Sequence, residues 1–83
     1  MRYTVTVSVK EEDKLAAIWN DAPNRAAVTR ASNRIDSLLR SSPLKHGLPL
    51  GDFRMLTIMP LTVVYSVSPE DCLVTVLDYF YEE

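Results

Sequence analysis

His46 is the residue of this chain best suited to proton transfer, because an imidazole titrates close to neutral pH. It lies beside Lys45, and the two together could transfer a proton or contact a phosphate. A lone histidine in a loop is, however, most often simply exposed. The sequence has no second histidine and only one cysteine, Cys72, so it predicts neither an internal disulfide nor a metal site.

Arginines and one tryptophan are the other candidates for binding nucleic acid. Four arginines fall within a single predicted helix: Arg25, Arg30, Arg34 and Arg40. Asp36 interrupts them, and such residues more often form a solvated helix surface than a nucleic-acid stripe. Trp19 could stack on a base, but its helical spacing from Leu15 and Ala22 is typical of a core residue. The formal charge of −2 also argues against a general binder of polyanions.

Composition predicts one compact domain that spans residues 1–83. Hydrophobic residues make up 47% of the 83 residues and charged residues 24%, and a chain of this length buries about 60–65% of its unfolded surface. No apolar run approaches the roughly 18 residues of a membrane span, and nothing resembles a signal peptide. A single cysteine also suits a reducing compartment. We therefore expect a cytoplasmic protein without membrane contact.

The elements that must position these residues are organised around a predicted β-hairpin at residues 52–67. Apolar residues alternate along its second strand: Leu61, Val63, Tyr65 and Val67. Residues 53–58 form the first strand. Met59 and Pro60 make a tight turn between the strands, where the missing amide hydrogen of the proline removes no ladder bond.

Periodicity predicts the remaining elements. Residues 3–9 alternate as a half-buried strand does, and residues 11–22 change to helical spacing with acidic residues in the first turn. A second helix begins with Pro23 at its first position and continues to about residue 41. Residues 44–51 are predicted as a loop, and residues 72–79 return to strand character.

These elements follow the order β-α-α-β-β-β, which predicts an α+β fold in two layers. The helical hairpin should pack on one face of an antiparallel meander sheet, with the first strand beside the last. Trp19 and Ile35 should both be buried between helices and sheet, because their apolar stripes are wide enough to cover the strands. A structure with either side chain largely exposed would contradict this packing.

The element order, together with the phrases PLKHGLPLGDFRML and LTVVYSV, resembles the RelE/ParE superfamily of toxins from bacterial type II toxin–antitoxin systems, which includes plasmid stabilisation proteins. The resemblance covers nearly the whole chain. It implies that RelE-like members cut messenger RNA in the ribosome without metal or cofactor, that ParE-like members inhibit DNA gyrase, and that an antitoxin silences both. An antitoxin partner and growth inhibition are therefore expected.

For the RelE branch, the resemblance implies a metal-independent endoribonuclease with few site residues. Arg54 would contact the scissile phosphate, and Tyr81 or His46 would transfer a proton. Lys45 would bind RNA together with Arg54. Arg54 also has a structural interpretation, as a strand arginine paired with a carboxylate such as Asp52.

Several positions depart from that branch. Leu56, Ile58 and Thr62 stand where its ribonucleases carry lysine or arginine, and Glu82 and Glu83 stand where a basic C-terminal segment is common. Cations there would stabilise the phosphate in the transition state. Two alternatives to a ribonuclease therefore stay open: a ParE-like or catalytically inactive toxin-fold protein that acts by binding, and a small ligand-binding or structural domain whose resemblance is coincidental.

A partner-binding surface is predicted on the sheet face that carries Arg54. If alternation holds through the hairpin, this face also carries Leu56, Ile58, Thr62, Val64 and Ser66. Aliphatic side chains left in water on so small a domain mark a contact site. An antitoxin would cover them, or a second copy of the chain would do so in a homodimer.

Overall fold

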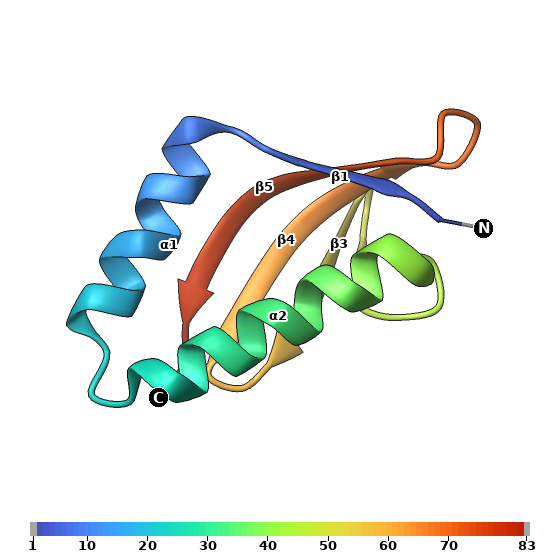
Figure 1. The fold of residues 1–83 in the computed structure, drawn as a ribbon. Coiled ribbons are helices and arrows are strands. Elements are labelled where there is room, and N and C mark those ends of the chain that lie inside the picture. Colours follow the sequence, from blue (N-terminus) through green and yellow to red (C-terminus); the bar gives the residue numbers. More distant parts are fainter. Residues whose placement is uncertain (1, 83) are drawn as a thin grey trace.

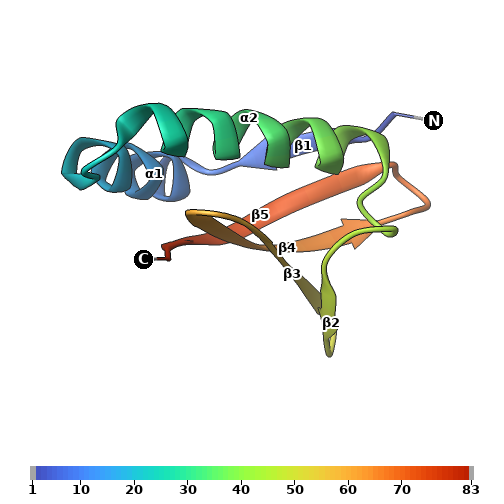
Figure 2. The same cartoon turned by 90° about the horizontal axis from the view of Figure 1, so that it is seen from below.

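The computed structural model describes residues 2–82, which fold into two layers (Figure 1). Its elements follow in the order β1 (Thr4–Val7), α1 (Val9–Asp21), α2 (Arg25–Ser41), β2 (Leu48–Leu50), β3 (Phe53–Ile58), β4 (Leu61–Ser68) and β5 (Leu73–Tyr81). Figure 2 shows both helices on the same side of the sheet. The predicted two-layer α+β fold is confirmed. Glu83, part of the expected acidic C-terminus, lies outside the described residues.

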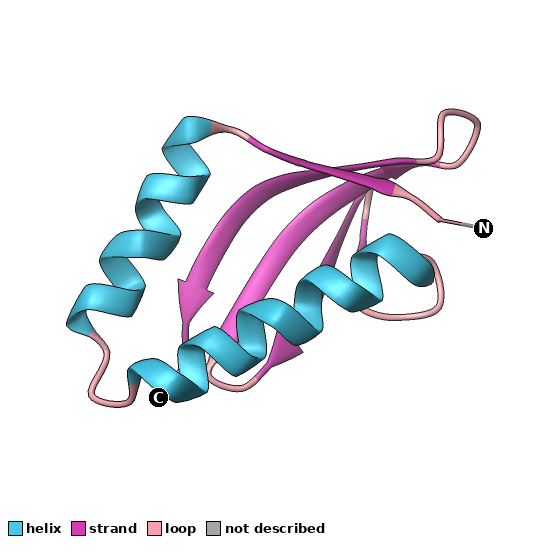
Figure 3. Ribbon diagram, viewed as in Figure 1, coloured by secondary structure: helices cyan, strands magenta, loops and turns pink. Residues whose placement is uncertain are grey.

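The sheet is mixed, with the strand order β1-β5-β4-β3-β2 (Figure 3). Strands β2 to β5 pair antiparallel with their neighbours in sequence, as a meander predicts. β1 lies beside β5, as expected, but runs parallel to it, with Val5 opposite Val74 and Val7 opposite Val76. The predicted antiparallel meander of three strands is therefore confirmed and extended by β2, and β1 makes the sheet mixed.

The segment predicted as a loop, residues 44–51, contains the short edge strand β2. Leu48 pairs with Met55 and Leu50 pairs with Phe53 in β3. Pro49 lies between them and is tolerated because an edge strand forms a ladder on one side only. The glycines and prolines around this strand are turn residues by composition, and they concealed its alternation from the sequence analysis.

Val9 begins α1 instead of ending β1, so the boundary between these elements lies earlier than predicted. Ser8 is the N-cap residue, and its carbonyl oxygen accepts a hydrogen bond from the Glu12 amide at 3.0 Å. Glu11 and Glu12 occupy the first turn, where the helix dipole favours carboxylates. Val9 points into solvent as a consequence and is 72% exposed.

α2 supplies the helical part of the core. Asn24 caps it, because its Oδ1 accepts a hydrogen bond from the Ala27 amide at 3.1 Å. Pro23 therefore precedes the helix, and the prediction that it is the first residue of the helix is wrong. The buried side chains of α2 belong to the predicted stripe: Val28, Ala31, Ile35 and Leu39. They join the buried residues of the sheet in a single core: Leu56, Leu61, Val63, Tyr65, Val74, Val76 and Tyr79.

α1 lies at the margin of the helix layer, beside β5, and buries none of its side chains completely. Ile35 of α2 is 2% exposed, as predicted, but Trp19 is 40% exposed, so the prediction that Trp19 lies in the core is wrong. Its indole Nε1 donates a hydrogen bond to Thr29 Oγ1 at 3.0 Å, and the Arg25 guanidinium lies 4.9 Å from the ring centroid. Within residues 2–82, no helix is both long enough and apolar enough to cross a membrane.

Candidate functional site

Tyr65 and Arg54 hold the loop between α2 and β2. The Tyr65 hydroxyl donates to two main-chain oxygens, those of Pro43 at 2.8 Å and His46 at 3.0 Å. Arg54 donates from Nη2 to the Leu44 carbonyl at 2.9 Å and from Nε to the His46 carbonyl at 3.4 Å. We name the main-chain carbonyl groups of Pro43, Leu44 and His46 the carbonyl cage. Arg54 is therefore engaged with main-chain oxygens of the protein itself.

Gly47 lets the loop turn back onto Tyr65. Its φ is +79°, and a Cβ at this position would lie 2.8 Å from the Tyr65 hydroxyl oxygen and 3.1 Å from the Met55 carbonyl oxygen. Burial raises the pKa of Tyr65, whereas the charge of Arg54 and its hydrogen bond act in the opposite direction. Tyr65 therefore keeps its proton at neutral pH and remains the donor to the carbonyl cage.

The residues predicted for catalysis and RNA binding do not form one site. Arg54 meets His46 through the His46 main chain, and Lys45 is exposed on the same loop. Tyr81 is level with the first residue of β4, whereas Arg54 is level with the fifth, which separates them by about 13 Å along the strands. Within residues 2–82, no ion pair includes Arg54, so the pairing expected with Asp52 is absent.

Leu56, Ile58 and Val64 do not share one face of the sheet, and the prediction that they do is wrong. The two-residue turn pairs Ile58 with Leu61 and Leu56 with Val63. Paired residues point to the same side, so even-numbered positions of β3 align with odd-numbered positions of β4. Leu56 and Ile58 consequently face the helices, whereas Val64 points away from them.

The same register separates the other residues of the predicted surface. Arg54 pairs with Tyr65 and faces the helices, whereas Thr62 and Ser66 lie with Val64 on the opposite side. We name this opposite side of the sheet the open face, because neither helix covers it (Figure 2). Leu56 belongs to the core, so a partner cannot reach it without displacing other residues.

The open face carries an apolar patch that the sequence analysis mostly missed. Pairing and alternation place apolar residues of four strands on this face, and we name six of them the open-face patch: Leu48, Leu50, Phe53, Met55, Val64 and Phe80. Leu48 is 65% exposed, and Leu50, Phe53 and Phe80 are exposed as well. The available signal was the Leu-Pro-Leu alternation immediately before a predicted strand.

Polar residues of the open face bond to one another at the turn end of the sheet. Thr62 is 2% exposed, and its hydroxyl lies 2.8 Å from the Thr57 hydroxyl and donates to Glu82 Oε1 at 3.0 Å. The position at which a ribonuclease relative would carry a cation thus holds a hydroxyl paired with a carboxylate. Within residues 2–82, no group of three or more histidine, cysteine, aspartate or glutamate side chains is placed to hold a metal ion.

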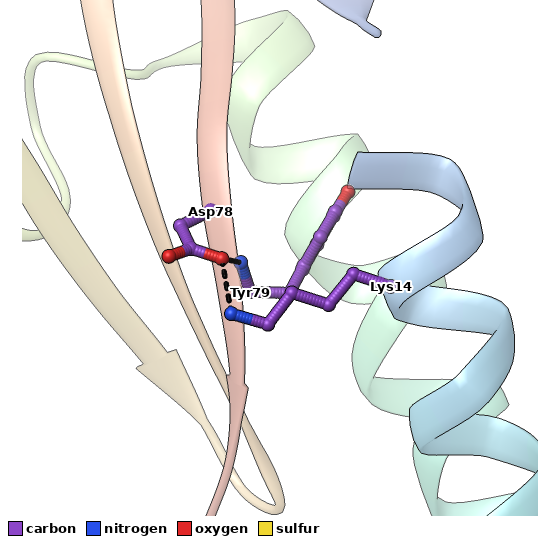
Figure 4. Close-up of polar contacts among 3 residues, drawn as sticks. All are labelled: Lys14, Asp78 and Tyr79. Atoms are coloured by element: carbon purple, nitrogen blue, oxygen red, sulfur yellow. Dashed lines mark hydrogen bonds and ion pairs between the residues drawn. The ribbon is translucent and has the colours of Figure 1, made fainter. Parts of the chain in front are cut away.

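Lys14 extends from α1 to β5 and is paired with Asp78 (Figure 4). Its Nζ lies 2.5 Å from Asp78 Oδ1 and 4.6 Å from the centroid of the Phe80 ring. The hydrogen bond from Lys14 holds the pKa of Asp78 below its usual value. Arg54 is the single lysine or arginine in the five described strands, and it faces the helices, so these strands bring no cation to the open face.

Comparison with known proteins identifies the fold. The sequence matches no protein-family model, and no curated protein is significantly similar to it. A chain of the toxin–antitoxin complex RelBE2 from Mycobacterium tuberculosis matches with a TM-score of 0.74 and 18% identity, over 99% of this chain and 100% of that one. A chain of the archaeal RelE–RelB complex from Pyrococcus horikoshii matches with a TM-score of 0.68 and 20% identity, over 98% and 96%.

The isolated RelE toxin of E. coli also matches, with a TM-score of 0.65 and 15% identity, over 98% of this chain and 85% of that one. Each of these similarities covers at least 98% of this chain and at least 85% of the chain compared with it. The RelE/ParE-like architecture predicted from the sequence is therefore confirmed. This chain has the fold of the RelE toxins of type II toxin–antitoxin systems.

Proposed function

We propose that this chain is the toxin component of a type II toxin–antitoxin pair and that it acts by binding proteins. The fold supports this proposal, because two of the similar structures are the complexes RelBE2 and RelE–RelB. The partner of this chain is then a cognate antitoxin. Toxin and antitoxin would meet in the cytoplasm, where both are synthesised.

The composition of the open face is the observation that carries the proposal. A surface that binds or cleaves RNA needs cations to neutralise phosphate charge. The open-face patch is instead apolar, the Lys14 ammonium beside its Phe80 is paired with Asp78, and Glu82 adds a carboxylate. Contiguous apolar side chains in water mark protein contact sites, so the open face suits a protein partner better than RNA.

The antitoxin would cover the open-face patch with the apolar side of a helix or an added strand. β2 is an edge strand, and the exposed Leu48, Leu50 and Phe53 lie around its turn, so this corner is accessible from two directions. A second copy of the chain could cover the same patch. We therefore expect a homodimer wherever the antitoxin is missing.

Binding to the product of the adjacent gene tests the proposal. Replacing Leu48 and Phe53 together by lysine should weaken this binding at least about tenfold, because both side chains lose their apolar contacts. Val9→Lys is the matched control, since Val9 is an exposed aliphatic residue remote from the open face. Unchanged affinity in a folded Leu48→Lys, Phe53→Lys variant would contradict the proposal, as would an equal loss in the control.

A metal-independent endoribonuclease acting on messenger RNA in the ribosome is the second candidate. The observation that favours it is the position of Lys45, His46 and Arg54 at one end of the sheet. Induced expression should then arrest growth and cut messages, and Arg54→Ala should abolish both effects. Circular dichroism must show that this variant folds, because Arg54 also binds the carbonyl cage. Growth and messages left unchanged by the wild type would exclude this candidate.

A further inference from the structure

We propose that the hollow between α2, β1 and β5 is a hydration site, in which a few ordered water molecules join Tyr79 of the last strand to α2. The hollow encloses about 170 Å³, enough for about five water molecules of about 30 Å³ each. It lies between the helix layer and the sheet, whereas the open-face patch lies on the other side of the sheet (Figure 2). This inference goes beyond the toxin–antitoxin proposal and does not depend on it.

Tyr79 points into the hollow with a hydroxyl that no protein group bonds within residues 2–82. It pairs with Val63 of the core, on the side of the sheet that faces the helices, and Figure 4 shows its ring extending from β5 toward the helix layer. Outside the strand ladder, its hydrogen bond is made by the main-chain amide, to Asp78 Oδ1 at 2.8 Å. The Tyr79 side chain is only 7% exposed. A buried hydroxyl without a protein partner takes water as its partner.

The hydroxyl oxygen of Tyr79 is within reach of water. Among residues 2–82, every side-chain oxygen or nitrogen that is completely inaccessible to solvent has a hydrogen-bond partner. The Tyr79 oxygen has none, so it must touch space that a water molecule can enter. That space is the hollow, because Tyr79 is part of its lining and the rest of the residue is buried.

Three polar side chains of α2 line the same hollow: Ser32, Asn33 and Asp36. Asp36 accepts a hydrogen bond from Arg40 through Oδ2 at 2.9 Å, which leaves its Oδ1 to accept from water. The side chains of Ser32 and Asn33 make no hydrogen bond to another group of residues 2–82. A buried water typically makes about three hydrogen bonds, and these groups together with the Tyr79 hydroxyl supply them.

The remaining walls of the hollow are apolar, so they direct the hydrogen bonds of the water toward Tyr79 and α2. These walls consist of aliphatic side chains from three elements: Val5, Val7, Ile35, Leu39 and Val76. The volume is below the range of about 300–1,000 Å³ for pockets that bind drug-sized ligands. The hollow therefore suits water better than a nucleotide or a larger metabolite.

The charges around the hollow select neither an anion nor a cation. Burial raises the pKa of Tyr79, and the negative charges of Asp36 and Glu12 raise it further. Tyr79 therefore keeps its proton at neutral pH and can donate to water. Asp36 is already paired with Arg40, so the hollow offers no unpaired carboxylate for a cation. A small neutral molecule that both donates and accepts hydrogen bonds fits these groups, and water is such a molecule.

Tyr79→Phe tests the proposal, because a hydrated hollow and a dry one predict opposite signs. If water bonds the hydroxyl, the variant should lower the melting temperature of the full chain by about 4–8 °C, the shift for one net hydrogen bond in a domain of this size. An unpaired hydroxyl in a dry hollow would instead make the variant more stable. Tyr81→Phe is the matched control, since Tyr81 lies on the same strand outside this hollow and should leave the melting temperature unchanged. A raised or unchanged melting temperature for Tyr79→Phe would overturn the proposal.

Two serines of α2 provide a second comparison. Ser32 lines the hollow, whereas Ser37 is exposed and does not. Valine at either position removes a hydroxyl, adds methyl groups and has a similar effect on helix propensity. Ser32→Val should lower the melting temperature further than Ser37→Val, because it displaces water from the Tyr79 hydroxyl. A smaller loss for Ser32→Val would mean that filling a dry space stabilises the fold, which contradicts the proposal.

A crystal structure at a resolution that shows ordered water provides the direct check. A water oxygen should lie about 2.7–3.0 Å from Tyr79 Oη and should bridge it to a polar side chain of α2. This water should be lost or displaced in Tyr79→Phe. Xenon under pressure, which enters dry apolar cavities, should not enter this hollow. Xenon found there, or no ordered water within hydrogen-bond distance of Tyr79 Oη, would refute the hydration site.

Discussion

The two helices lie in one layer, yet they are attached to the sheet in different ways. α2 buries Val28, Ala31, Ile35 and Leu39 in the core, and the loop that follows it is fixed by the Tyr65 hydroxyl. α1 has the apolar spacing of an amphipathic helix but no fully buried side chain. Amphipathic spacing therefore identifies the side of a helix that is turned inward. How much the helix contributes to stability depends on the surface against which that side packs.

The polar contacts of the helices differ in the same way. The bonds at the end of α2 join a fully buried tyrosine and an arginine to main-chain carbonyls. The contacts of α1 join exposed side chains, Lys14 with Asp78 and Trp19 with Thr29. Exposed contacts exchange with water at little cost, whereas buried donors and acceptors must keep their partners. α1 should thus be the element that opens first.

Truncating one isoleucine in each helix should give the largest contrast. Ile35→Ala leaves a cavity in the core and should lower the free energy of unfolding by about 2–5 kcal/mol. Ile18→Ala removes a half-buried side chain of the same type and should cost about 1 kcal/mol. Urea denaturation followed by circular dichroism measures both. Equal losses would mean that α1 is as firmly packed as α2.

Removing a tyrosine hydroxyl should have a smaller effect that is confined to the α2 end of the molecule. Tyr65→Phe removes the donor of the Pro43 carbonyl, leaves the His46 carbonyl only its 3.4 Å bond from Arg54, and should cost about 1–3 kcal/mol. Tyr81→Phe is the matched change on the same side of the sheet near the end of α1 and should be close to neutral. Thermal unfolding of the two variants makes the comparison, and a larger loss for Tyr81→Phe would reverse it.

The smallest effect is expected for the pair that ties α1 to β5. A double-mutant cycle with Lys14→Gln and Asp78→Asn should give a coupling below about 1 kcal/mol, because both side chains are well exposed and the pair is screened by water. The pKa of folded Asp78 is lower than its usual value of 3.8, so the contribution is present above pH 3.8. It is lost as the pH falls through the lower pKa of the folded state.

Asp78→Asn should therefore lower the stability slightly at neutral pH, and its difference from the wild type should shrink as the pH falls through the lowered pKa of folded Asp78. Stability measured by urea denaturation along a series of acidic buffers provides the check. A coupling that grows as the pH falls below 3.8 would have the wrong sign for this pair.

Local sequence patterns predicted most of the helices and strands but not all of the contacts that these elements make. The alternation in residues 53–58 and 61–67 located β3 and β4 to within a residue, and the stripe of α2 located its buried side. The pairing of the two hairpin strands was also open to prediction, because a two-residue turn at Met59 and Pro60 places Ile58 opposite Leu61. Alternation within each strand does not give the register between the strands, and by itself it predicts the wrong face for Val64.

Other features depend on contacts between distant segments. Helical spacing could not show that Trp19 lies beside Thr29 at the margin of the layer. The contacts of Arg54 with main-chain oxygens have no signal in the residue types, since any residue supplies a carbonyl. The open-face patch required β2, whose proline and two flanking glycines have the composition of a loop. These are the parts of the candidate site that needed a three-dimensional structure.

The parallel pairing of β1 with β5 constrains the order in which the molecule can assemble during its own synthesis. Thr4 pairs with Leu73, 69 positions later (73 minus 4), and the Thr6 hydroxyl donates to the Val74 carbonyl at 3.2 Å. At roughly 5–20 residues per second, β1 leaves the ribosome roughly 3–14 seconds before its partner strand. Pairings this far apart in sequence also form slowly. The helices and the β3–β4 hairpin can form earlier, so translation that stops before residue 73 yields a chain whose sheet cannot close around β1.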